Sequence, residues 1–117
     1  ILGHGLEMAR ASGLTLRLKL ADIPFLSKSE ELAQQGFITG ASVRNWASYG
    51  EAITLPENMP EWQRMLLADP QTSGGLLVSV SADKADALVE QVRAAGYPLA
   101  SIVGSAEEGA PGIVVDG

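Results

Sequence analysis

The sequence predicts an α+β domain of mixed α/β order, in which helices pack on one or both faces of a mixed β-sheet. Segments with helical periodicity and segments with strand alternation follow one another along the whole chain, so neither class dominates. Glycine or proline stands near most of the boundaries between them. The 117 residues suit a single domain, and 46% hydrophobic residues are sufficient for a core of Leu, Val, Ile and Ala.

The first part of the chain predicts a helix followed by a strand. Residues 3–12 place apolar side chains at helical spacing, and Gly13 follows as a C-terminal stop. In residues 14–20 leucines alternate with polar residues, which is the pattern of a half-buried strand. A connector over residues 21–29 and a short helix over residues 30–35 follow.

The middle of the chain predicts two helices with a short strand between them. Residues 40–49 and 60–68 have apolar residues at helical spacing, and residues 51–55 favour a strand. Trp46 and Tyr49 are interpreted as core anchors, because too few basic residues accompany them for a base-stacking surface.

The last third predicts a strand, a helix and two further strands. Residues 75–81 are apolar and follow two glycines, which favours an interior strand. Residues 82–95 predict a helix, with the preceding serine as its N-cap. Residues 99–103 and 112–115 are the expected last strands, and residues 104–111 are the small-residue and acidic hairpin loop between them.

Charge and composition disfavour several classes of function. Fourteen acidic and eight basic residues give a net charge of −6, which disfavours nucleic acid and anionic membranes as partners. The absence of cysteine excludes disulfides and thiolate chemistry within the segment. No apolar run approaches the roughly 20 residues that span a bilayer, and no signal peptide is visible. The default expectation is a soluble, cytoplasmic protein.

The start of the chain indicates a piece of a longer polypeptide. It begins at Ile1 without methionine, and an apolar face at helical spacing is already present in the first residues. The expected organisation is a single domain over residues 1–117 that forms the second half of a larger protein.

The most unusual stretch is the heptad Asp69-Pro70-Gln71-Thr72-Ser73-Gly74-Gly75, which runs directly into an apolar segment. Its proline ends the preceding helix. Its hydroxyl, amide and backbone N–H groups suit an anion, and its glycines permit close approach of a ligand or positive φ. A tight helix-to-strand turn, with the Asp69 carboxylate bonded to nearby N–H groups, is the alternative.

Other candidate residues are isolated. His4, the only histidine, is either a helix-terminus or packing residue or a catalytic residue, since histidine commonly serves as an acid or base in catalysis. Arg44 and Asn45 offer a charged fork and an amide for phosphate or carboxylate, or serve as local helix residues. The chain contains no Walker A loop, and one histidine without cysteine makes zinc unlikely.

Three stretches resemble the C-terminal half of the selenophosphate synthetases (selenide, water dikinases). They are residues 2–9, residues 40–50 and residues 69–77, and the heptad is the most specific part. The resemblance covers essentially the full chain. It implies the C-terminal α/β domain of the wider group of aminoimidazole-ribonucleotide-synthetase-like enzymes. The implied reaction converts ATP, selenide and water to selenophosphate, AMP and phosphate, with Mg²⁺ as cofactor, in a cytoplasmic homodimer.

The resemblance also implies that essential parts lie outside this chain. The N-terminal domain of the family holds the cysteine or selenocysteine nucleophile and a catalytic lysine, and the family's metal aspartates lie upstream of Ile1. This chain alone is therefore expected to have no turnover and to form one wall of the active-site cleft. The residues expected to face the cleft or the phosphates are Asp69, Gln71, Thr72, Ser73, Gly74, Gly75, His4, Arg44 and Asn45.

Alternative functions remain open from the sequence. One is another enzyme of the same superfamily, in purine, thiamine or hydrogenase-maturation metabolism. The other is a non-catalytic assembly module that needs a partner chain, for which an exposed apolar patch would be expected.

Overall fold

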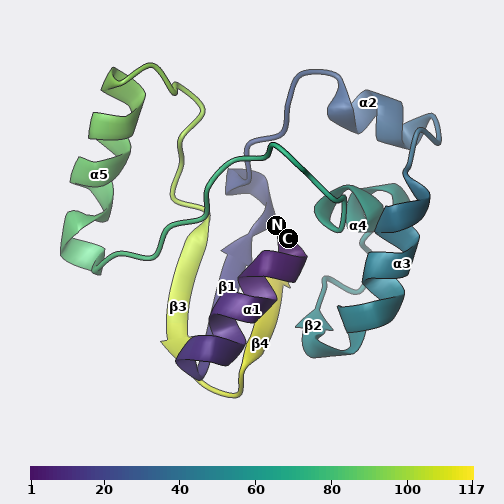
Figure 1. Cartoon of the computed structure of the whole chain (residues 1–117), viewed down its shortest axis with the longest axis horizontal. Coiled ribbons are helices and arrows are strands. Elements are labelled where there is room, and N and C mark those ends of the chain that lie inside the picture. The colour runs from purple at the N-terminus through teal and green to yellow at the C-terminus, as the bar shows by residue number, and fades with distance from the viewer.

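A four-stranded mixed sheet with five α-helices forms the fold, in a computed structural model that describes residues 1–117 (Figure 1). The helices are α1 (Leu2–Ser12), α2 (Ser29–Gln34), α3 (Gly40–Tyr49), α4 (Glu61–Leu67) and α5 (Ala82–Ala94). The strands are β1 (Leu14–Lys19), β2 (Ile53–Thr54), β3 (Gly104–Glu108) and β4 (Gly112–Asp116). Short 3₁₀ turns cover Leu20–Asp22 and Gly50–Ala52. The expected α+β class is confirmed.

Strands β1 and β4 form the centre of the sheet. The order is β2-β4-β1-β3, with β1 parallel to β4, β2 parallel to β4, and β3 antiparallel to β1. Leu16 on β1 lies opposite Ile113 on β4 and Ala106 on β3. The outer edge of β3 has no strand partner.

The core lies between α1 and one face of this sheet. Because side chains alternate along a strand, the leucines of β1 and the apolar residues of β4 share the face that α1 covers. Nine buried residues form this cluster: Leu2, Leu6, Ala9, Leu16, Leu18, Ile53, Leu67, Ile113 and Val115. The helix ends at Gly13, whose φ of 68° is the left-handed conformation that glycine adopts easily.

The opposite face of the sheet carries charged side chains. The Arg17 guanidinium donates to Asp116 at 2.8 Å and to Glu107 at 3.3 Å, so one arginine joins β1 to both neighbouring strands. These hydrogen bonds raise the pKa of Arg17. The Ser105 hydroxyl, and then Arg17, lower the pKa of Glu107.

The predicted strand over residues 75–81 is wrong, because this segment pairs with no strand. Leu76 is 93% exposed, and Val78 and Val80 are also exposed. Leu77 alone turns toward the core, where it lies near Gly5 of α1. The apolar pattern favoured an interior strand, but a pattern along the chain cannot show whether a sheet edge is available to it.

The assignments at the last hairpin are also wrong. Residues 99–103 form no strand, and the expected loop over residues 104–111 instead supplies strand β3. The polar sequence of β3 concealed it, because an edge strand open to solvent needs no apolar alternation. Its pairing with β1 and the ion pair between Arg17 and Glu107 hold it in place.

Helix α5 stands apart from the sheet (Figure 1). It has no buried residue, and Ser81 occupies its N-cap position without a side-chain hydrogen bond. No helix in the structure has the length and apolar character that crossing a membrane requires.

Leu6→Ala should lower the free energy of unfolding of this chain by about 2–5 kcal/mol, because Leu6 is 1% exposed and its loss leaves a cavity. Leu26→Ala is the matched control, since Leu26 is 74% exposed and its change should stay within about 0.5 kcal/mol. Urea unfolding measures both. Equal effects of the two variants would contradict the assigned core.

The stabilising effect of Glu107 should disappear at low pH. Its folded-state pKa lies below the usual value of 4.5, so its contribution is present above that value and is lost as pH falls through the folded-state pKa. The wild-type chain and Glu107→Gln should therefore differ in the urea concentration at the unfolding midpoint at neutral pH, and this difference should become smaller at about pH 3. The control is Glu108→Gln, on the neighbouring exposed residue that makes no ion pair. A difference that stays constant with pH would contradict this assignment.

Candidate phosphate-facing loop

The Asp69–Gly75 loop begins at the buried end of α4. Leu67 and Ala68 are each 1% exposed, and Leu67 belongs to the main core. The proline at position 70 then prevents the helix from continuing. The loop therefore starts from a rigid point and extends onto the surface.

The rest of the loop is exposed and has few internal partners. Residues 70–75 are all exposed, with a turn at Thr72 and Ser73. Neither hydroxyl makes a hydrogen bond within the chain, and no backbone N–H of residues 71–75 donates to a backbone acceptor. Such a run of free donors can bind an anion.

The two glycines of the loop do not use positive φ, since neither is among the glycines in that region. A Cβ at position 74 would meet the Gln71 side chain at 3.0 Å, whereas one at position 75 would meet open space. Gly74 therefore permits the close approach of Gln71 within the turn. The Gln71 side chain is otherwise without a hydrogen bond in the chain.

Asp69 is anchored to the start of α3. Its Oδ1 atom accepts from the Ser42 hydroxyl at 3.1 Å and lies 3.3 Å from the Thr39 hydroxyl. Its Oδ2 atom has no hydrogen-bond partner in the chain. The carboxylate is half-buried, so one oxygen is held by the protein and the other remains available.

Arg44 and Asn45, the two helix candidates, point to different partners. The Asn45 amide donates to the Ala68 carbonyl oxygen at 3.0 Å, so it holds the root of the loop. Arg44 is exposed and forms no ion pair, which leaves its guanidinium available to an anion. Trp46 packs against the core, as predicted, and the Arg64 guanidinium lies 5.1 Å from its ring.

His4 is exposed in the first turn of α1. The start of this helix contacts the loop region, because the backbone nitrogen of Ile1 donates to the Leu67 carbonyl oxygen at 3.2 Å. Gly3, next to His4, packs against the ring of Tyr49. Burial raises the pKa of the Tyr49 hydroxyl.

Thr39 and Ser42 were not among the predicted site residues, although both contact Asp69. Thr39 is the N-cap of α3, where its hydroxyl oxygen accepts from the Ser42 N–H at 3.1 Å. A threonine three residues before a polar residue, at the start of a helical pattern, is the sequence signal for this cap. The contact with Asp69, 27 residues from Ser42, has no such signal.

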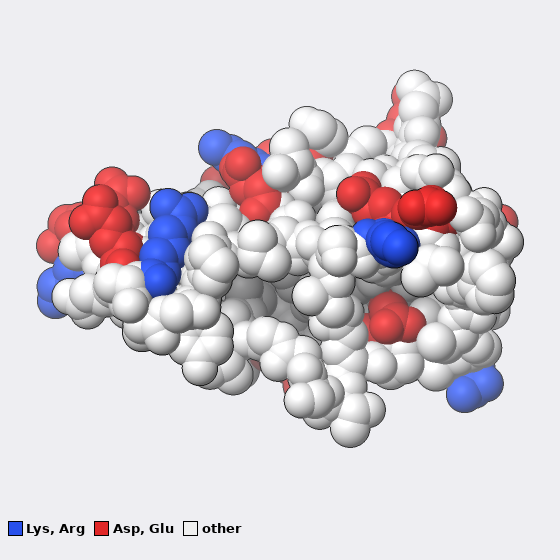
Figure 2. Space-filling model, turned by 90° about the horizontal axis from the view of Figure 1, so that it is seen from above, with Lys and Arg blue, Asp and Glu red and all other residues white.

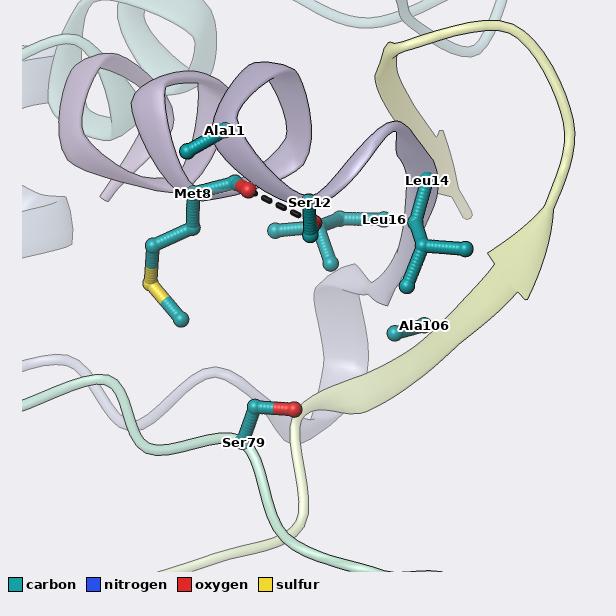
Figure 3. Close-up of a pocket in the computed structure, with 7 residues that line it drawn as sticks. All are labelled: Met8, Ala11, Ser12, Leu14, Leu16, Ser79 and Ala106. Atoms are coloured by element: carbon teal, nitrogen blue, oxygen red, sulfur yellow. Dashed lines mark hydrogen bonds between the residues drawn. The ribbon is translucent and has the colours of Figure 1, made fainter.

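Two other features lie away from the loop. An apolar hollow of about 330 Å³ lies between α1, β1, β3 and the segment at Ser79, and none of the candidate residues lines it (Figure 3). The face seen in Figure 2 shows acidic and basic side chains scattered among larger uncharged areas.

The structure contains no group of three or more His, Asp or Glu side chains that could hold a metal ion. Asp69 is the only acidic residue among the nine candidates. These residues do not form a magnesium site by themselves.

The chain is similar to known proteins over almost its whole length. Selenide, water dikinase of Rhizobium meliloti (strain 1021) is 68% identical over 115 residues, covering 98% of this chain and 33% of that protein. The enzyme of the same name from Pseudomonas straminea is 46% identical over 98% of the chain and 32% of the protein. The chain thus spans about a third of the length of these relatives. The family model described as "AIR synthase related protein, C-terminal domain" matches residues 1–117, and the chain belongs to this family.

Proposed function

We propose that this chain is the C-terminal domain of an ATP-dependent selenide, water dikinase, which makes selenophosphate, AMP and phosphate from ATP, selenide and water. The similarity to enzymes of that name over 98% of the chain supports the assignment. The observation that supports a site for this function is the Asp69–Gly75 loop. Contacts from α3 fix its first residues, while the N–H and hydroxyl groups of the turn have no partner in the chain.

The loop has the donors that a phosphate group requires. Thr72 and Ser73 present two hydroxyls, and residues 71–75 present backbone N–H groups on the same exposed turn. These groups would donate to phosphate oxygens and stabilise negative charge as it moves between them during transfer. Arg44 is the exposed cation that could add a bidentate contact.

Asp69 would have a different role, because a carboxylate repels phosphate. Its free Oδ2 atom can accept a hydrogen bond from water or from a protonated substrate group, or contact a cation supplied with the nucleotide. Asn45 would serve the loop indirectly, through the Ala68 carbonyl. His4, exposed near the same end of α1, is a further candidate for the cleft wall.

The remainder of the active site would belong to an N-terminal domain of the same polypeptide. The relatives are about three times as long as this chain, which leaves room for such a domain. Mg²⁺ and ATP would be bound mainly there, in a cytoplasmic homodimer, and the 117 residues alone would have no turnover. Exposed Phe37, Leu76 and Tyr97 are apolar surface that a partner domain could cover.

The full-length protein that contains this chain should consume ATP in a selenide-dependent reaction. Phosphorus NMR under anaerobic conditions, with ATP and Mg²⁺, should show AMP, phosphate and a selenophosphate resonance only when selenide is present. The isolated chain is the control, and it should leave ATP unchanged. ATP consumption that ignores selenide, or that yields ADP, would point instead to another enzyme of the superfamily.

Changes in the loop should reduce turnover of that full-length protein. Thr72→Ala should lower kcat by about 100-fold, the effect typical of removing one donor to the transferred charge. Asp69→Ala should also lower kcat, because it removes the free Oδ2 atom and the contact that fixes the root of the loop. Ser79→Ala is the control, because Ser79 is an exposed serine beyond the loop. Wild-type turnover in both loop variants would mean that the heptad is only a structural turn.

A further inference from the structure

The contacts around Asp69 contain fewer hydroxyl protons than possible hydrogen bonds. The Thr39 and Ser42 hydroxyls lie 3.0 Å apart, and both also lie within hydrogen-bond distance of Asp69 Oδ1. Each hydroxyl has one proton to donate. Ser42 makes the shorter contact with Asp69, at 3.1 Å against 3.3 Å for Thr39. With Ser42 donating to Asp69 Oδ1, the Thr39 hydroxyl can donate either to the same carboxylate oxygen or to the Ser42 hydroxyl.

Burial makes the Ser42 contact important. Ser42 is 0% exposed and is the only buried polar residue in the chain. A buried hydroxyl without a partner costs about 1–3 kcal/mol, so its hydrogen bond to the carboxylate is not exchanged for water. Thr39, in contrast, is exposed and can bond to solvent.

The Ser42 hydroxyl is not needed for the helix cap. The cap consists of the Thr39 hydroxyl oxygen and the backbone N–H of Ser42, and the N–H remains when the Ser42 side chain is shortened. The Ser42 side chain therefore acts toward Asp69 rather than toward its own helix.

Two contacts from α3 hold two consecutive residues at the root of the loop. Asn45 binds the Ala68 carbonyl at 3.0 Å, and Ser42 binds Asp69 Oδ1 at 3.1 Å. Fixing Ala68 sets the position of the backbone. Fixing Oδ1 sets the rotation of the Asp69 carboxylate and thereby the direction in which the free Oδ2 atom points.

We propose that Ser42 is a positioning residue, which fixes the Asp69 carboxylate so that Oδ2 stays available to water, a protonated substrate group or a cation and the following turn faces the transferred phosphate. This inference rests on the proposed function, since it assigns Ser42 to the same loop. A displacement of about 1 Å in a reacting group can cost about a hundredfold in rate, so loss of this contact should affect turnover more than binding.

The test compares Ser42→Ala with Ser42→Thr in the full-length protein, by selenide-dependent formation of AMP. Ser42→Ala should lower kcat by about 10-fold to 100-fold with little change in the KM for ATP, because the donors that bind phosphate remain. Ser42→Thr keeps the hydroxyl and should recover most of the lost kcat. Ser48→Ala, an exposed serine of the same helix without a hydrogen bond, is the matched control and should behave as wild type.

A second comparison separates positioning from a general loss of structure. In the Asp69→Ala background the Ser42 hydroxyl has no carboxylate left to position, so adding Ser42→Ala should lower kcat no further. A further loss of the same size in that background would overturn the proposal. So would a Ser42→Ala protein with the kcat of Ser48→Ala.

If Ser42→Ala does not fold, as thermal unfolding would show, Ser42→Cys takes its place, because the thiol fills the site but is a weak donor. It should then show the lowered kcat, and wild-type kcat would overturn the proposal. Failure of the proposed function is distinguishable, since the wild-type full-length protein would then make no selenide-dependent AMP at all.

Discussion

The packing of α1 against the centre of the sheet is the interaction on which the rest of the structure depends. Leu2, Leu6 and Ala9 cover the inward side chains of β1 and β4, and Leu67 of α4 joins the same buried cluster. The α4 helix therefore ends at a fixed place. Because Ala68 and Asp69 follow directly, the candidate loop is connected to the core through two residues of backbone.

The loop combines a rigid root with a free tip. Contacts from α3 hold Ala68 and Asp69, while the hydroxyls and N–H groups of the turn have no partner in the chain. A ligand that binds such a turn need not compete with hydrogen bonds inside the chain. The donors that it meets extend from residues that are already held in place. This division suits a surface that forms one wall of an active site between two domains.

The segment from Leu76 to Val103 contrasts with this arrangement. Its apolar residues are largely exposed, α5 contributes nothing to the core, and the outer edge of β3 is unpaired. Exposed apolar side chains beside an open strand edge are unfavourable for an isolated domain. They fit the proposal that a further domain of a longer polypeptide covers this surface.

Sequence by itself determined the α+β class and the positions of α1, β1, α3, α4 and α5, and it singled out the Asp69–Gly75 heptad as a candidate site. These features are local: periodicity, helix stops and unusual residue runs are readable without knowing neighbours. Only the tertiary structure decided that residues 75–81 form no strand, that β3 consists of polar residues, and that Ser42 contacts Asp69. Each of these features depends on which distant segments of the chain meet. A strand needs the edge of another strand, and a carboxylate needs a hydrogen-bond donor. The spacing of residues along the chain does not show where either partner will lie.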